Sequence, residues 1–314
     1  MPIFPAWVIV AFAAEVLWVA GNLIDKYLIE KYFATDDEEE GGVGTLIIFS
    51  GLFGFVIALF AYLASAGEIN VSMNIVSFGL AVGVLNGLWV WLYLQALERT
   101  ELSRVVPLLQ TVPIFGLLFA LVMLGEVLTS TQIIAAVIIL AGAVLLSIRL
   151  KSSGTKFDYL SFFLMLGAAA IVAFTDVLFK TITLFSDFWS TAFWMGLGIA
   201  LFGLFLYTCI GGYRRQFNKY IQEKNYGVWS GNIINEVVDA GANLTFAAAT
   251  ILGPVALVQT ANAYQPFLIL VASLTLSKLA PKYFSEETDG VTLTQKLIGI
   301  GIITVGSYLM YLTL

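Results

Sequence analysis

The chain is dominated by apolar segments of about 20 residues that follow one another with short polar breaks. A bilayer core is about 30 Å thick, and a helix needs about 20 apolar residues to cross it. Only 11% of the 314 residues are charged, against about 25% in soluble globular proteins. A soluble core of this size could not cover so much apolar surface, so the sequence predicts an all-α membrane protein rather than a soluble repeat protein.

The apolar segments predict about ten transmembrane helices. The expected ranges are 5–25, 45–65, 74–97, 103–124 and 130–149 in the first half, and 158–182, 188–211, 227–250, 254–276 and 293–313 in the second half. Strands are not expected, because these segments are longer than a barrel strand of about 9–11 residues and do not alternate in polarity. The first segment lacks the basic region of a cleaved signal peptide, so we expect a permanent helix there.

Three short motifs recur in the same order in the two halves. They are Asn22 to Lys26 and Asp176 to Lys180, Pro113-Ile-Phe115 and Pro266-Phe267, and the capping-box pairs Thr129/Gln132 and Thr292/Gln295. The last pair is more widely spaced because an insertion near residues 280–290 has no counterpart after Gly125. We therefore predict two repeats, residues 1–150 and 158–314, joined by a linker at 151–157. Five helices in each repeat make the two repeats inverted in the membrane.

The sequence also resembles a known family. The similarity lies in residues 96–103 (ALERTELS) through Pro113, then in Leu124-Gly-Glu126 and in residues 132–142. These stretches resemble the EamA-type domain of the drug/metabolite transporter superfamily. Residues 247–306 are similar to a second, degraded copy that departs from the pattern at Ser277-Lys278. The resemblance implies a ten-helix solute carrier with a central cavity and with both termini in the cytoplasm.

The charge distribution favours the opposite orientation. All of the 15 lysines and arginines except Lys180 lie in or beside the loops that follow odd-numbered predicted helices. Positively charged loops normally face the cytoplasm, which would place both termini outside. The charge count carries slightly more weight here, but the orientation stays open.

Several kinds of chemistry are excluded by composition. The chain has no histidine and one cysteine, Cys209, which excludes Ser-His-Asp and Cys-His catalysis, histidine metal sites and intrachain disulfides. It also lacks the Walker motif of ATP-hydrolysing proteins. Asp176 and Asp239 are the only pair considered for an intramembrane aspartyl enzyme, and no motif surrounds them. We therefore predict no enzymatic activity, no metal and no cofactor.

The eighth predicted helix has a polar stripe, consisting of Asn232, Asn235, Glu236, Asp239 and Asn243. Their spacing places them on one face, opposite Ile233, Ile234 and Val237. Such a stripe is expected to line water or substrate, and the alternative is hydrogen bonding between helices. Glu236 and Asp239 are close enough to share one proton, which would suit proton coupling.

The first helix carries Glu15 near mid-membrane. The stretch Ala13 to Val16 resembles the first helix of small multidrug resistance transporters, and that resemblance implies exchange of protons for cationic solutes. The alternative is a carboxyl group bonded to a neighbouring helix. Asn22 lies four residues before Lys26 on the same helix face and is a further candidate for substrate binding.

Lys26, Asp176 and Lys180 are predicted as gates, because the motifs that contain them are placed symmetrically in the two halves. The alternative for the two lysines is snorkelling to the membrane interface. On the third helix, Asn86, Trp89 and Tyr93 share a face that suits an organic cation or zwitterion, and the alternative is packing.

The sequence therefore predicts a secondary transporter that moves a small organic metabolite or drug-like solute by alternating access, with or without proton coupling. The alternative is a flippase for a lipid or lipid-linked sugar, in which Arg99 and Arg104 would hold a phosphate. The expected partners are a small organic solute and the bilayer, without nucleic acid, and a monomer would suffice. The expected location is the cell membrane.

Overall fold

The structure is a computed structural model that describes residues 6–33, 43–119, 122, 129–151, 154–183, 186–222, 226–252, 262, 264–284, 286 and 289–312. Helices make up nearly all of this part, as the apolar segments predict. They are α1 (Ala6–Leu28), α2 (Val43–Ala64), α3 (Met73–Arg99), α4 (Leu102–Val105), α5 (Val112–Phe119), α6 (Ser130–Ser147), α7 (Tyr159–Thr183), α8 (Phe188–Cys209), α9 (Gly211–Gln222), α10 (Tyr226–Leu252), α12 (Gln265–Leu279) and α13 (Gly290–Tyr311). A π-helical turn, Ile29–Phe33, continues α1.

Six of the described helices are long and apolar enough to cross a membrane, namely α1, α2, α3, α7, α8 and α13. Shorter apolar helices cover 102–116, 130–146 and 265–279. Large apolar side chains such as Phe60 and Phe163 are about 60% exposed on the outer surface, where lipid rather than water can cover them. The chain is therefore an all-α, multi-pass integral membrane protein. The count of ten spans stays a prediction.

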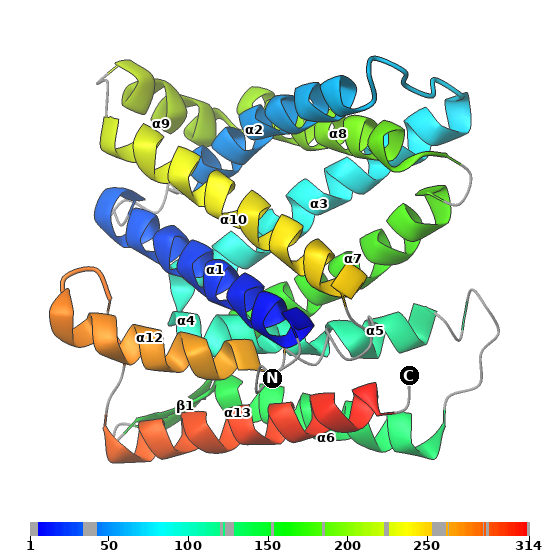
Figure 1. Ribbon diagram of the computed structural model, residues 1–314. Helices are drawn as coiled ribbons and strands as arrows, with labels where there is room; N and C mark the ends of the chain where they lie inside the picture. Colours follow the sequence, from blue (N-terminus) through cyan, green and yellow to red (C-terminus); the bar gives the residue numbers. More distant parts are fainter. Residues whose placement is uncertain are drawn as a thin grey trace.

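Helices from the two halves pack against each other in pairs. The main pairs are α2 with α8, α3 with α8, α1 with α10, α6 with α13 and α3 with α7 (Figure 1). Small residues allow close contact: a Cβ atom added to Gly83 on α3 would lie 2.0 Å from the Met195 carbonyl oxygen of α8. Gly79 and Gly87 also face α8, which agrees with the packing role of small residues in membrane helices.

Prolines divide the fourth predicted span. Instead of one helix over 103–124, the chain forms α4, a 3-10 segment at Val106–Thr111 that contains Pro107, and α5. Proline lacks the N–H that an α-helix interior requires. Pro266 lies in the first turn of α12, where a missing N–H is tolerated. The start of the predicted helix over 254–276 cannot be traced, because residues 253–261 lie outside the described part.

Two elements were not expected from the sequence. A short antiparallel hairpin, β1 (Ile148–Lys151) and β2 (Gly154–Phe157), occupies the predicted linker, with Ile148 opposite Phe157. The expectation of no strands was wrong there because the pattern considered only membrane-spanning segments. The second element, α9, is an amphipathic helix that buries Phe217 and leaves Arg214 and Arg215 exposed.

The two predicted capping boxes have different outcomes. Thr129 and Gln132 form one at the start of α6, with both reciprocal hydrogen bonds present. The second prediction was wrong, because α13 begins earlier and the Asp289 carboxylate accepts the hydrogen bond from the Thr292 N–H at 3.0 Å. Gln295 instead donates across the helix interface to carbonyl oxygens of residues 145 and 148.

Candidate functional site

Side chains of α1, α3 and α10 meet in a polar cluster inside the helix bundle. We call Asn22, Asp25, Tyr93, Asn235, Glu236 and Asp239 the carboxylate cluster. Asn235 of α10 donates to the Asp25 carboxylate of α1 at 2.7 Å. The Tyr93 hydroxyl of α3 donates to the Asn22 side-chain oxygen at 2.8 Å and also lies in hydrogen-bonding reach of Asp25. These contacts join three helices around one acidic side chain.

Two more carboxylates belong to this cluster. Glu236, one residue after Asn235, accepts a hydrogen bond from the Ser50 hydroxyl of α2. Asp239 accepts from Asn243 on its own helix at 3.1 Å. The charges of Glu236 and Asp239 both act on Asp25. Three acidic groups are thus close enough to interact electrostatically.

The residues of the polar stripe of α10 differ in burial along the helix. Asn232 is buried and donates to the Val228 carbonyl of its own helix. Farther along, Asp239 and Asn243 are exposed, while Asn235 and Glu236 are half-buried. Side chains at this spacing share one helix face, and the exposed Ile233, Ile234 and Val237 lie on the opposite face. Asp239 therefore faces solvent from the polar side of α10 and not from the lipid-facing side.

No basic side chain contacts the carboxylates of the cluster in the described part of the chain. Lys26 follows Asp25 in the sequence, but its ammonium donates to the Leu97 and Thr100 carbonyl oxygens at 3.1 and 3.2 Å and pairs with Glu30 at 2.8 Å. It is 5% exposed, so it does not snorkel. Lys26 closes the end of α3, and the cluster keeps an excess of negative charge.

The predicted aromatic face of α3 lies beside the cluster. The Trp89 indole N–H donates to the Asn86 side-chain oxygen at 3.1 Å. The rings of Trp89 and Tyr93 lie 6.3 Å apart between centroids. Tyr93 therefore connects the carboxylates to an aromatic surface, which is the combination that binds substituted ammonium groups.

Glu15 is separate from these contacts. It is fully buried, and neither of its carboxyl oxygens has a hydrogen-bond partner among the described residues. The alternative interpretation, a carboxyl group bonded to a neighbouring helix, was therefore wrong in this part of the chain. Burying a polar group without a partner is unfavourable, so Glu15 is a place where a proton or a cationic group would be stabilised.

The contacts of the described residues do not test the predicted symmetric gates. Asp176 of α7 is exposed, and the Lys180 side chain lies outside the described part of the structure. Lys26 has the capping role given above. The prediction of paired gates at Lys26, Asp176 and Lys180 is therefore untested by these contacts.

Sequence reasoning missed Asp25 and Ser50, and it treated Tyr93 only as an aromatic neighbour. A local signal existed for Asp25, because Asn22 and Asp25 are three residues apart and share a helix face. No local signal existed for Ser50, whose contact with Glu236 spans 186 positions of the chain. Among the residues that the structure describes, no group of three or more acidic or cysteine side chains could hold a metal ion.

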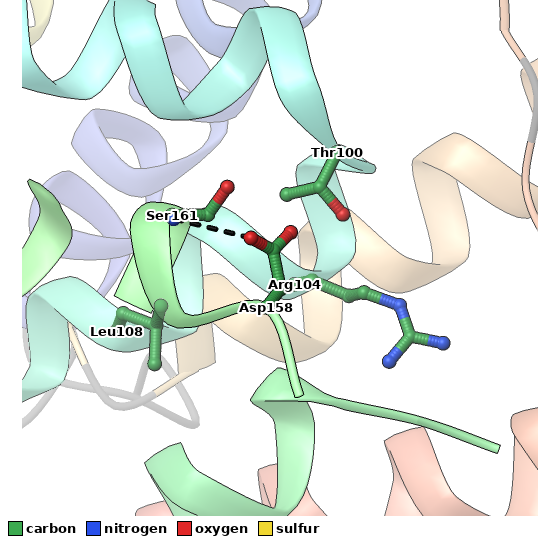
Figure 2. A pocket seen from close by; sticks show the side chains of 5 residues that line it. All are labelled: Thr100, Arg104, Leu108, Asp158 and Ser161. Atoms are coloured by element: carbon green, nitrogen blue, oxygen red, sulfur yellow. Dashed lines mark hydrogen bonds between the residues drawn. The ribbon is translucent and has the colours of Figure 1, made fainter. Parts of the chain in front are cut away.

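A small pocket lies between the ends of α3 and α7 (Figure 2). It is lined by Thr100, Arg104, Leu108, Asp158 and Ser161, and its volume is about 10 Å³. That is close to the minimum needed for one water molecule. The pocket cannot hold an organic solute and does not include any residue of the carboxylate cluster.

Comparison with known proteins adds to this geometry. Residues 5–148 match the model of the EamA-like transporter family. This part of the chain is similar to that family. The EamA-like part includes α1 and α3, and therefore Asn22, Asp25 and Tyr93 of the cluster.

Two similar proteins accompany the EamA-like match. The "Probable amino-acid metabolite efflux pump" of Salmonella typhimurium is 29% identical over 140 residues, which cover 41% of this chain and 44% of that protein. The chain thus matches less than half the length of this relative. A solved structure described as "Crystal structure of protein" matches with a TM-score of 0.54 and 16% identity, over 98% of this chain and 97% of its own. That likeness shows a shared fold alone.

Proposed function

We propose that this protein is a secondary transporter that exports a small organic solute carrying an ammonium group, such as an amino acid or an amine, across the cell membrane. The observation that carries the proposal is the carboxylate cluster. Asp25, Glu236 and Asp239 form an acidic site between α1 and α10 that no described basic side chain neutralises. The amino-acid metabolite efflux named for the Salmonella relative supports the class of solute.

The chemistry of the cluster suits this solute. Carboxylates attract an ammonium group, and amide and hydroxyl groups such as those of Asn235 and Tyr93 can hydrogen-bond a second polar group. The Trp89 and Tyr93 rings add an aromatic surface for a cation. Glu15 and the pair Glu236/Asp239 are the proposed proton-coupling groups, since each carboxyl group can exchange a proton for a bound cation.

Alternating access is proposed from the pairing of the helices. In the two predicted repeats, residues 1–150 and 158–314, α1 corresponds to α7 and α3 corresponds to α10. If each helix is replaced by its counterpart, the observed pair of α1 with α10 becomes the pair of α7 with α3, which is also observed. An approximate two-fold axis between the repeats requires this. Inverted repeats of this kind can rock about a central site and expose it to one side at a time.

A lipid flippase is less well supported. Arg104, which that reading requires for a phosphate, is 3% exposed and donates to the Leu146 and Ile148 carbonyl oxygens. Its guanidinium group is therefore already hydrogen-bonded to the backbone. No described feature favours an intramembrane enzyme over a transporter.

The test is charge movement measured on a solid-supported membrane with purified protein in liposomes. A panel of amino acids, amines and quaternary ammonium compounds is applied with and without a pH gradient. We expect transient currents from at least one ammonium-containing solute, and a loss of more than about tenfold in Asp25→Asn and Glu236→Gln.

The matched control is Glu68→Gln, which removes an exposed carboxylate from the loop between α2 and α3. It should leave the currents unchanged. Because an electroneutral exchange gives no current, uptake of radiolabelled solute is measured in the same liposomes. Absence of both current and uptake for every compound, with monodisperse protein, would reject the proposal.

A further inference from the structure

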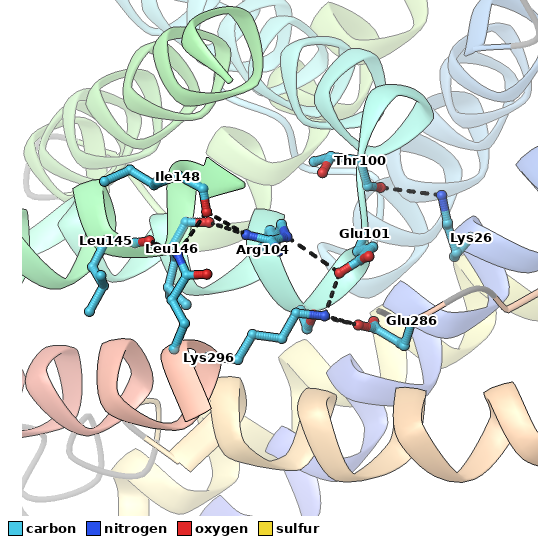
Figure 3. Close-up of polar contacts among 11 residues, drawn as sticks. Lys26, Thr100, Glu101, Arg104, Leu145, Leu146, Ile148, Glu286 and Lys296 are labelled. Atoms are coloured by element: carbon cyan, nitrogen blue, oxygen red, sulfur yellow. Dashed lines mark hydrogen bonds and ion pairs between the residues drawn. The ribbon is translucent and has the colours of Figure 1, made fainter. Parts of the chain in front are cut away.

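A second group of buried charges lies at the end of the bundle that carries the β-hairpin (Figures 1 and 3). Lys296 of α13 is fully buried and pairs with two carboxylates, Glu101 and Glu286. Glu286 lies at 2.5 Å and its side chain is 3% exposed. It also accepts a hydrogen bond from Ser103 at 2.8 Å. We call Glu101, Lys296 and Glu286 the ion clasp.

Arg104 balances the charge of the ion clasp. Its guanidinium contacts Glu101 at 3.4 Å and donates to the Leu146 and Ile148 carbonyl oxygens at 2.9 and 3.0 Å. Among the described residues, two acidic and two basic side chains therefore form one network of balanced charge (Figure 3). A buried ion pair in such a network is stable only while every charge keeps its partner.

The partners in the ion clasp come from different halves of the chain. Glu101 immediately precedes α4, and Arg104 lies within it. In the second half, Lys296 lies in α13, and Glu286 lies just before that helix. Glu286 belongs to the insertion at 280–290 that has no counterpart in the first half. Tyr283 of the same insertion packs edge-on against Tyr27 of α1, with 5.1 Å between ring centroids. The insertion thus contacts both α1 and the α4 region.

The ion clasp is also connected to the carboxylate cluster. Thr100, next to Glu101, accepts a hydrogen bond from Lys26 through its carbonyl oxygen. Lys26 in turn follows Asp25, the central residue of the cluster. Figure 3 shows Lys26 bonded to Thr100, and Glu101, the next residue in the chain, in contact with Lys296. A movement of α1 at the cluster would therefore be transmitted to the residues beside the clasp.

From these contacts we infer that the ion clasp holds this end of the transporter closed, and that this end opens when Lys296 separates from Glu101. The inference rests on the proposed function, since only a carrier with alternating access needs this end to open. Charged groups suit such a contact, because they are paired when the end is closed and hydrated when water enters. An apolar plug would have no comparable compensation in the open state.

The test is the rate at which a maleimide modifies a cysteine behind the clasp in detergent-solubilised protein. Thr292 is the reporter position: it is fully buried, its hydroxyl has no partner among the described residues, and it lies one turn before Lys296. Thr292→Cys is made in a Cys209→Ser background, because Cys209 is an exposed native cysteine. The assay needs no solute and no transport, so its outcome is independent of the proposed substrate.

Lys296→Met leaves two adjacent carboxylates without their shared cation, and we expect modification of the introduced reporter thiol to become about tenfold faster. The double variant Lys296→Met, Glu286→Gln keeps the Glu101–Arg104 pair and leaves no unpaired charge in the clasp, so it should stay as slow as the parent. Lys278→Met, which removes an exposed lysine at the end of α12, is the matched control and should also stay slow.

Glu286→Gln is the milder second variant in case Lys296→Met does not fold, and it should give an intermediate rate. Equal rates in the parent, Glu286→Gln and Lys296→Met, all monodisperse, would overturn the inference. Faster modification in the double variant Lys296→Met, Glu286→Gln as well would also overturn the inference, because loss of packing and not loss of charge balance would then be the cause. If modification is faster in the clasp variants as expected but no solute is transported, the proposed function is rejected. The inference that the clasp keeps this end closed is then still supported.

Discussion

The carboxylate cluster and the ion clasp are two groups of polar and charged residues within one helix bundle, and they differ in charge balance. The clasp pairs each acidic side chain with Lys296 or Arg104. In the cluster, the Asp25 carboxylate accepts a hydrogen bond from the neutral amide of Asn235, and no described basic side chain pairs with it. A balanced network holds helices together, whereas an unbalanced one attracts a charge from outside. The difference separates a structural contact from the proposed binding site.

The two regions also differ in which helices they join. The cluster lies between α1, α3 and α10, whose long apolar surfaces already pack together. The clasp joins α4 and α13, where the broken fourth span offers only a four-residue helix. Charge pairing therefore replaces apolar packing where regular helix contacts are scarce.

The largest effect should follow from removing the shared cation of the clasp. We expect Lys296→Met to lower Tm in detergent by about 5 to 10 °C, since breaking a buried ion pair on one side costs about 3 kcal/mol or more. Fluorescence-detected thermal unfolding measures this directly. An unchanged Tm would contradict the structural role of the clasp and would remove the contrast with the cluster.

A smaller effect, on binding and not on stability, is expected from Tyr93→Phe. The variant keeps the ring that packs beside Trp89 but removes the hydroxyl that donates to the Asn22 side-chain oxygen. We expect KM for the transported solute to rise about fivefold with little change in Tm, because a hydrogen bond between neutral groups contributes about 1 kcal/mol. A large fall in Tm with unchanged KM would place Tyr93 among the structural residues instead.

Glu15 should respond differently from both regions. Its carboxyl group is buried without a described partner, so Glu15→Gln removes no observed hydrogen bond and should change Tm by less than about 2 °C. If Glu15 carries the coupling proton, solute uptake driven by a pH gradient should be lost while exchange of solute at equal pH continues. Uptake that still responds to the gradient would assign coupling to Glu236 and Asp239.

The smallest effect should come from a charge outside both regions. The hydrogen bond from the Thr292 backbone N–H lowers the pKa of Asp289 from its usual value of 3.8. A carboxylate with a lowered folded-state pKa stabilises the fold above its unfolded pKa, and this stabilisation is lost as the pH falls through the folded pKa. Asp289→Ala should therefore lower Tm by about 2 °C near pH 6.

This difference between Asp289→Ala and the parent should shrink as the pH falls below 3.8. Thermal unfolding between pH 3 and pH 6 tests both the lower Tm of Asp289→Ala near pH 6 and the decrease of this difference at low pH. Asp187 at the start of α8 offers a matched comparison, because its carboxylate accepts a hydrogen bond from the Ser190 N–H in the same way. A difference that grows at low pH would exclude the capping explanation.

Much of the fold followed from local sequence patterns. The predicted range 74–97 corresponds to α3 and 188–211 to α8, each within two residues, because about 20 consecutive apolar residues specify a span without reference to the rest of the chain. The capping box at Thr129 and the shared face of Asn232 to Asn243 were predictable for the same reason. Both depend only on spacing along one helix.

The sequence by itself therefore determined the membrane class, most helix ranges and the polar face of α10. Only the tertiary structure decided the contacts between distant residues. Asn235 on that face donates to Asp25, 210 positions away in the chain, and Lys296 pairs with Glu101, 195 positions away. It also placed the Lys26 ammonium group at the carbonyl oxygens at the end of α3. Periodicity fixes which side of a helix is polar, but the choice of partner depends on which helices pack together, and that is set by close contacts such as Gly83 against Met195.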